Sequence, residues 1–218
     1  MTHTAAYPLA GVQPATAPTV AGLDLLTDRE RDADHLARGI GDVLADRDLR
    51  DITIATHWAQ VGHLRHVALS IEATGDPVAV WELLARMADG AGTAALLGRR
   101  FRGEPELRET VGAALVAHTS RASGRVVVFP GSARIVGTLT VGEVLSSSAI
   151  DRIRVLAGGP ADAASMLQTR DFVRPRWSCG QLVLDVQPAA GGLLVPFETP
   201  TPTPCCAAHG PVAAVEPW

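Results

Sequence analysis

The stretch ITIATHWAQVGHLRHVALSIEA, residues 52–73, decides the fold of the first half of the chain. Its two ends, 52–56 and 64–73, are rich in β-branched and other apolar residues, which predicts two strands. The residues between them, 57–63, predict the loop of a hairpin. This stretch therefore places a two-stranded antiparallel unit near the centre of the N-terminal half.

Three of the seven histidines of the chain, His57, His63 and His66, lie within this stretch. His57 and His63 bracket the predicted loop, so a metal-binding or catalytic pair there is one hypothesis. His66 has the opposite strand parity to His63, so the three would not share a face without a bulge. Loop histidines are more often solvated or satisfied within a core, and that is the favoured interpretation.

Helices are predicted on both sides of the hairpin. Thr27 and Glu30 have the spacing of a capping box, and apolar residues recur at helical spacing from there to about Asp46. Asp76 followed by Pro77 predicts the start of a second helix, which ends near Gly90. A Gly-rich passage over 90–103 leads to a third predicted helix over 104–118.

The pattern changes at Arg125, after which the chain is mainly strand-like. Two predicted hairpins account for most of it, with strands at 126–129 and 134–140 and at 182–186 and 193–197. We therefore expect an α+β fold, with an α-rich N-terminal half (three amphipathic helices and a two-stranded hairpin) and a β-rich C-terminal half of antiparallel hairpins. The expected organisation is a disordered leader (1–22), an α-rich subdomain (23–124), a β-rich subdomain (125–198) and an extended Thr/Pro tail (199–218) that carries cysteines and a histidine.

Composition excludes several classes of function. The 19 positive charges are all arginine, because the chain has no lysine, so a Schiff-base cofactor site and a Walker-type phosphate lysine are excluded. A net charge of −4 argues against a nucleic-acid partner. No apolar run approaches the length of a membrane span, so no membrane partner is expected and the cytoplasm is the expected location.

The reactive side chains concentrate near the C-terminus, at Cys179, Cys205, Cys206 and His209. The spacing of Cys206 and His209 lets a thiolate and an imidazole hold one metal ion. Cys179 would join them if the final hairpin folds back, and Cys205 or a water would complete the site. Thiolate with imidazole favours zinc, or with less preference iron. The sequence thus predicts a small cytosolic metal-binding protein with its site at these four residues.

Two other hypotheses remain open. The absence of catalytic motifs, together with the leader and the Thr/Pro tail, favours a non-enzymatic interaction or regulatory protein that has a protein partner and no cofactor. Cys179, close to Arg174 and Arg176 in sequence, is also a candidate nucleophile or redox thiol, because neighbouring cations lower a thiol pKa. The sequence predicts neither a substrate nor an oligomeric state.

Overall fold

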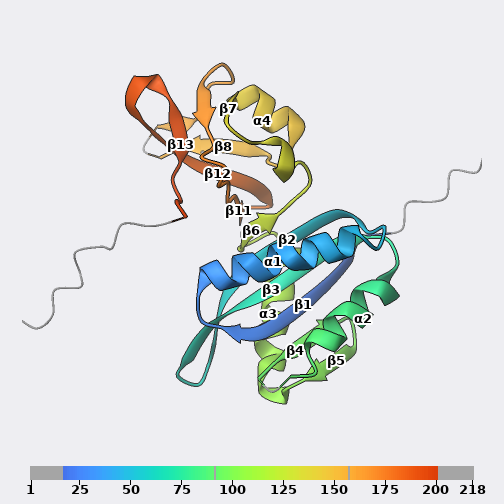
Figure 1. Cartoon of the computed structure of the whole chain (residues 1–218). Coiled ribbons are helices and arrows are strands. Elements are labelled where there is room, and N and C mark those ends of the chain that lie inside the picture. Colours follow the sequence, from blue (N-terminus) through green and yellow to red (C-terminus); the bar gives the residue numbers. More distant parts are fainter. Residues whose placement is uncertain (1–16, 91, 157, 201–218) are drawn as a thin grey trace, which may run out of the picture.

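The computed structural model describes residues 17–90, 92–156 and 158–200. Thirteen strands in this part of the chain form one mixed sheet (Figure 1). Its first elements are β1 (Thr19–Thr27), α1 (Glu30–Ala45), β2 (Arg50–Val61), β3 (Leu64–Thr74), α2 (Pro77–Met87), β4 (Ala94–Leu97), β5 (Arg100–Gly103) and α3 (Arg108–Thr119). The later elements are β6 (Arg125–Val128), β7 (Thr138–Thr140), α4 (Val141–Ser147), β8 (Arg152–Val155), β9 (Gly159–Pro160), β10 (Met166–Gln168), β11 (Arg176–Ser178), β12 (Gln181–Pro188) and β13 (Leu194–Pro196).

The strands follow the order β5-β4-β1-β3-β2-β6-β11-β12-β13-β10-β7, with β8 and β9 branching from β12. Residues 19–119 form an N-terminal lobe, at the bottom of Figure 1, and residues 125–198 form a C-terminal lobe above it. Strand β6 joins the lobes, because it pairs with β2 on one side and with β11 on the other.

Strand β3 explains why the N-terminal lobe has helices on both faces of its sheet. Its odd-numbered residues from Val67 to Ala73 enter the hydrophobic core beneath α1 and α2. Its even-numbered residues point to the opposite face, where His66, Ser70 and Glu72 make hydrogen bonds beneath α3. One face of this sheet is therefore apolar, and the other holds polar groups that must find partners.

Helix α3 lies unusually close to the sheet, and Gly22 on β1 permits this. A Cβ atom at Gly22 would lie 2.4 Å from Val111 Cγ1 of α3 and 3.2 Å from the Val111 carbonyl oxygen. No side chain fits in that space. The close approach brings His118 and Thr110 of α3 within hydrogen-bonding distance of the strands.

The C-terminal lobe has its own core. Buried side chains from β6, α4, β8, β12 and the segments between them form one cluster, in which Val144, Leu167 and Leu184 are almost completely buried. The capping box of α4, in which Thr140 and Glu143 bond each other's backbone amides, fixes the start of that helix. Because β6 also contributes Val127 to the N-terminal core, the two cores meet at this strand.

The predicted fold class is wrong. The N-terminal half contains the three expected helices, yet it also contributes five strands, so it is not α-rich. Strand β1 begins at Thr19, within the segment expected to be a leader, and β4 and β5 lie in the Gly-rich passage. Strands β4 and β5 have four residues each and no β-branched side chain, so they lack the signature that marks a strand in sequence. Strand β1 has three β-branched residues in nine, of which only Thr19 and Val20 are adjacent.

Several local predictions can be compared directly with the structure. The Asp76 cap of α2 and the final hairpin of β12 with β13 are confirmed. Thr27 does not cap α1, because it is the last residue of β1 and Arg29 precedes the helix. The hairpin predicted around residues 130–132 is wrong, because β6 pairs with β2 and β11 whereas β7 pairs with β10.

Candidate functional site

The free edge of β2 is the most distinctive feature of the sheet. Strand β2 pairs with β3 along its whole second half, down to Val61 and Leu64. On its other edge it pairs with β6 only from Ile54 to Thr56. Among the residues that the structure describes, no strand pairs with this edge over 57–61, which spans about 17 Å at ~3.3 Å per residue.

The register of the hairpin shows which backbone groups face this edge. Gly62 and His63 form a two-residue turn, so the flanking pair of Val61 and Leu64 is hydrogen-bonded across the hairpin. Hydrogen-bonded and non-hydrogen-bonded pairs alternate along an antiparallel ladder. Trp58 and Gln60 therefore direct their backbone N–H and C=O groups away from β3, toward the free edge.

A cleft of about 1110 Å³ lies along this edge. Its walls come from both lobes: the end of β2, the start of α1, one side of α3, the loop before β6, β11 and the segment just after β13. The lining includes the carboxylates Glu30, Glu106, Glu109 and Glu198, the guanidiniums Arg125 and Arg176, and the rings of His57, Trp58 and Trp177.

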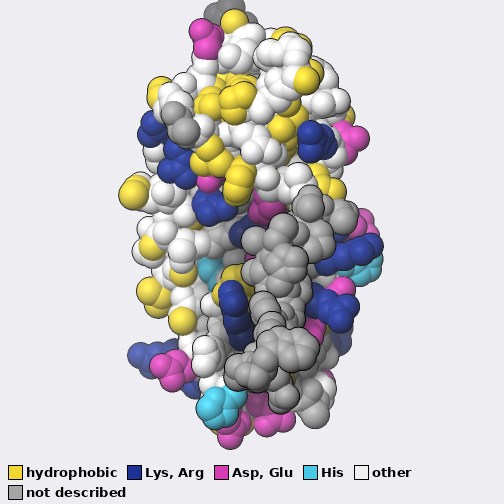
Figure 2. Space-filling view, turned by 90° about the vertical axis from the view of Figure 1, so that its left-hand side faces the viewer, with side chains coloured by type: hydrophobic (Ala, Val, Ile, Leu, Met, Phe, Trp, Pro, Cys, Tyr) yellow, Lys and Arg dark blue, Asp and Glu magenta, His cyan; other side chains and the backbone are white. Residues whose placement is uncertain are grey.

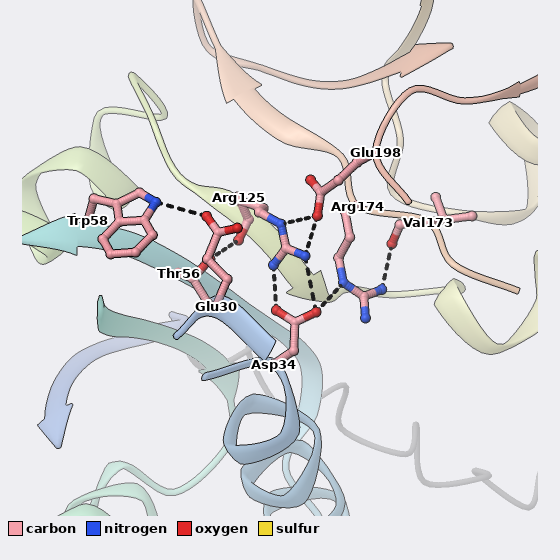
Figure 3. A network of polar contacts seen from close by, with 8 residues as sticks. All are labelled: Glu30, Asp34, Thr56, Trp58, Arg125, Val173, Arg174 and Glu198. Carbon is pink, nitrogen blue, oxygen red and sulfur yellow. Dashed lines mark hydrogen bonds and ion pairs between the residues drawn. The ribbon is translucent and has the colours of Figure 1, made fainter. Parts of the chain in front are cut away.

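One wall of the cleft is fixed by hydrogen bonds between distant segments (Figure 3). Trp58 Nε1 donates to Glu30 Oε1 at 2.8 Å, and Arg65 stacks on the Trp58 ring with its Cζ atom 4.1 Å from the ring centroid. Thr56 Oγ1 donates to the Arg125 carbonyl oxygen at 3.2 Å. Trp58 nevertheless remains 47% exposed, which makes it a large apolar surface available to a ligand.

Behind this wall, a buried ion network joins the two lobes (Figure 3). Asp34 of α1 accepts hydrogen bonds from both terminal nitrogens of Arg125 and, at 2.8 Å, from Arg174 Nε. Arg125 Nε also donates to Glu198 Oε1 at 2.6 Å. The network holds α1, β6, the segment before β11 and the segment after β13 in a fixed arrangement around one end of the cleft.

The charges of this network stabilise one another. Burial alone would raise the pKa of Asp34, but the hydrogen bonds and positive charges of Arg125 and Arg174 outweigh it and hold the pKa below the usual value. Burial would lower the pKa of Arg125, and its bonds to Asp34 and Glu198 raise it instead. Asp34 and Arg125 are therefore held ionised at neutral pH, and the Arg125 charge is compensated within the protein. Burial lowers the pKa of Arg174, although the Asp34 charge opposes this shift.

The opposite wall contains a chain of four hydrogen-bonded side chains. His57 Nε2 lies 2.8 Å from Ser70 Oγ, Ser70 Oγ lies 2.7 Å from His118 Nδ1, and His118 Nε2 lies 3.0 Å from Glu72 Oε2. His57 is the member that lines the cleft, whereas Ser70 and His118 are almost completely buried. A second buried group, in which Asp24 accepts from Thr110 and bonds His66, lies further along the same face.

The Ser70, His118 and Glu72 arrangement has the hydrogen bonds of a nucleophile, a base and an orienting acid. Ser70, however, has no exposed surface and lies on a central strand beneath α3. A substrate carbonyl cannot reach its hydroxyl, so these contacts do not make Ser70 a nucleophile. The accessible end of the chain is His57.

Trp177, on the cleft wall next to His118, carries an unpaired donor. Its ring lies edge-on to the His118 ring, with centroids 6.2 Å apart, and Arg121 stacks on it. Trp177 Nε1 is buried and has no hydrogen-bond partner among the described residues. Such orphan donors are rare in native structures and tend to occur at functional sites.

The prediction of a metal-binding protein is wrong. Within residues 17–90, 92–156 and 158–200, no group of three or more His, Cys, Asp or Glu side chains has the arrangement to hold a metal ion. Cys179 is exposed in the turn between β11 and β12, with a positive φ of 50°. Cys205, Cys206 and His209 lie outside the described residues, as does the tail that carries them.

The other sequence-based candidates are separated from one another. Arg174 and Arg176 are paired with Asp34 and Asp185, so their charges are engaged away from the Cys179 thiol. His63 is exposed in the hairpin turn, His66 is fully buried against Asp24, and His57 lies on β2, not in a loop.

None of the helices in the described part of the chain is long and apolar enough to cross a membrane.

Comparison of the chain with protein-family models, curated proteins and solved structures finds no match. Its function must therefore be inferred from the cleft.

Sequence reasoning missed most residues of this cleft. Glu106 and Glu109 were not singled out, Glu30 was assigned only to a capping box, and Trp58 was taken as a packing residue. Nothing in the sequence indicates that β6 stops pairing at Thr56. One signal was available: His66, Ser70 and Glu72 alternate with Val67, Leu69 and Ile71, so polar side chains occupy one face of a strand. That alternation indicates a face with partners of its own, because a buried polar side chain needs a hydrogen bond.

Proposed function

We propose that this protein is a peptide-binding module that captures an extended segment of a partner polypeptide along the free edge of β2. The observation that carries the proposal is the end of the β6 ladder at Thr56, beside a cleft, while β2 continues to Val61. An unpaired strand edge is a template for another strand, and adding an extended peptide to it is a common mode of recognition.

The other edges of the sheet support this assignment. Strand β5 ends the sheet on one side with four residues, including the exposed Arg100 and Arg102. Strand β7 ends it on the other side with three residues. Short strands and charged side chains discourage pairing with a further strand. The β2 edge has neither protection: β2 is twelve residues long, and its residues over 57–61 are uncharged at neutral pH, because burial lowers the pKa of His57 to about 4.

The size of the cleft fits a peptide better than a small metabolite. Small-molecule pockets commonly have volumes of roughly 300–1,000 Å³. The cleft here exceeds that range and follows a strand edge of five residues. A bound strand would place alternate side chains toward α3 and toward Trp58 and Glu30.

The charge of the cleft favours a ligand with lysine or arginine. Four carboxylates and two guanidiniums line it. Arg125 is neutralised by Asp34 and Glu198, and Arg176 faces Asp185, so the positive charges are compensated within the protein. Glu106 and Glu109 are exposed on the α3 side and make no ion pair with another described residue. On the face shown in Figure 2, charged side chains are most frequent on the N-terminal lobe.

The test uses peptides that are selected from a library of random decapeptides for binding to the intact protein. We expect the selected peptides to carry basic residues and to bind the Gln60→Ala variant as they bind the original protein. Gln60→Pro removes the outward N–H and leaves β2 paired to β3, so it should weaken binding at least tenfold. Gln60→Ala is the matched control, because it removes the same side chain and keeps the donor. Equal binding by both variants would contradict strand addition.

A further inference from the structure

We propose that His57 is the specificity-determining residue of this cleft: its Nδ1 atom meets the ligand, and the buried His118–Glu72 pair sets whether that atom accepts or donates a hydrogen bond. The inference rests on the proposed peptide-binding function and identifies the contact that selects among peptides.

His57 Nδ1 is the only end of the hydrogen-bond chain that opens into the cleft. Nε2 of the same ring is used by Ser70, and Nδ1 makes no hydrogen bond within the described residues. His57 lines the cleft and is partly exposed, and Nδ1 is not among the fully buried unpaired atoms of that part of the chain. A ligand in the cleft can therefore reach this nitrogen.

Gly124 fixes the orientation of the His57 ring. A Cβ atom at Gly124 would lie 2.5 Å from His57 Cε1, and Gly124 has a φ of 129°, in the region that favours glycine. The ring thus packs against bare backbone on one side and is held by Ser70 on the other. It presents one atom to the ligand in one orientation.

The protons of the chain determine what that atom offers. Hydrogen bonding to His118 lowers the pKa of Glu72 despite its burial, so Glu72 is a carboxylate and His118 Nε2 must donate to it. When His118 is neutral, its Nδ1 has no proton and accepts from the Ser70 hydroxyl. Ser70 Oγ then accepts from His57 Nε2, which leaves His57 Nδ1 as an acceptor.

When His118 is protonated, every hydrogen bond after Glu72 reverses. His118 Nδ1 then donates to Ser70 Oγ, the Ser70 hydroxyl donates to His57 Nε2, and the proton of the neutral His57 ring moves to Nδ1. His57 now offers a donor to the same ligand atom. His57 itself stays neutral in both states, because burial and the His118 charge lower its pKa to about 4.

The groups that face His118 come from three strands and from the segment after α3. Glu72 and Ser70 lie on β3, His57 on β2 and the Trp177 ring on β11. Arg121, just after α3, stacks on Trp177 and acts on Glu72 through its charge. Glu72 is the carboxylate that compensates a charge on His118, and its side chain is 23% exposed, so a proton can enter and leave from that end.

The first test observes the imidazole nitrogens of the free protein by ¹⁵N NMR during a pH titration. We expect His57 to carry its proton on Nε2 at alkaline pH and on Nδ1 once His118 is protonated. Ser70→Ala should uncouple the two rings, so His57 no longer changes tautomer with His118, and Ser70→Thr should keep the coupling. A His57 tautomer that is the same at all pH values, or the same response in Ser70→Ala, would overturn the proposal.

The second test measures the affinity of a selected peptide as a function of pH. A peptide group that bonds His57 Nδ1 as an acceptor is mismatched when that atom becomes a donor, and the reverse holds for an accepting group. The affinity should therefore differ by about five- to fiftyfold between the two states of His118. His57→Phe should abolish this dependence, and the exposed turn residue His63→Phe should leave it unchanged. A peptide that needs the Gln60 N–H but shows no dependence on His57 would overturn this inference and leave the proposed function standing. A tautomer change without binding of any peptide would overturn both.

Discussion

The imidazole of His57 is partly buried and held neutral, so the stability of the folded protein depends on pH. Its folded-state pKa of about 4 lies below the usual value of 6.5, because burial and the charge of His118 disfavour its cation. The unfolded chain therefore binds a proton at His57 at a higher pH than the folded chain does. The contribution of His57 to stability is complete above pH 6.5 and is lost as the pH falls toward 4.

We expect the free energy of unfolding to fall between pH 6.5 and pH 4 by up to about 3 kcal/mol because of this one residue. Chemical denaturation of the original protein and of His57→Gln at several pH values measures it. The variant should show a smaller decrease over this window. Parallel curves for the two proteins would show that the environment of His57 does not disfavour its cation.

At the residue scale, the sequence indicated that the His57 side chain was a candidate for a site, but it did not indicate where in the fold His57 lies. His57 was predicted in a loop because Trp58, Ala59 and Gln60 break the β-branched pattern of the preceding residues. In the structure β2 continues through them, because β3 supplies a partner as far as Val61. Pairing with a neighbour can override a weak local preference, which is why strand ends are hard to predict.

At the scale of elements, the packing of α3 on the sheet depends on one missing side chain. We expect Gly22→Ala to lower the free energy of unfolding by about 1–3 kcal/mol, because its Cβ would force α3 away from β1. Gly112→Ala in α3 itself is the control, since no atom lies within 4 Å of the added Cβ. It should be neutral or stabilise the protein by up to about 1 kcal/mol. Thermal and urea unfolding of the two variants measure the difference, and equal effects would contradict it.

The elements also show how much of the fold was predictable. The places of helices α1, α2 and α3 were predicted to within a few residues, because apolar residues recur at helical spacing in each of them. Strands β1 and β4 were missed, because they pair with strands far away in the chain. Strand β5 was missed because it has only four residues, and it pairs with β4 alone. The Ala94–Leu97 strand, for example, pairs with residues 21–24, and nothing in its own sequence indicates that partner.

For the whole molecule, the Asp34 network should control how firmly the lobes are joined. Asp34→Asn removes the charge that two buried guanidiniums share, whereas the carboxylate of Glu198 contacts only Arg125. We expect destabilisation of about 3 kcal/mol or more, measured by urea unfolding. Asp89→Asn breaks the exposed pair with Arg102 and should cost less than about 1 kcal/mol. Similar losses in the two variants would mean that the network does not hold the lobes together.

The same network shapes the cleft, since Arg125 and Glu198 line it. Asp34→Asn should therefore also weaken the binding of a selected peptide. Amide exchange should become faster in β6 and in residues 173–176. Faster exchange confined to α1 would instead indicate a local effect on that helix. Neither the network nor the cleft could be predicted from sequence, because Asp34, Arg125 and Arg174 come from three separated segments.

The most direct test of peptide capture is the exchange of two backbone amides, those of Trp58 and Gln60. Both N–H groups face the free edge of β2, so they should exchange quickly in the free protein and at least tenfold more slowly with a saturating selected peptide. The amides of Ala59 and Val61, which bond to β3, should be protected in both states. A peptide that binds tightly but leaves the exchange of Trp58 and Gln60 unchanged would contradict strand addition at this cleft.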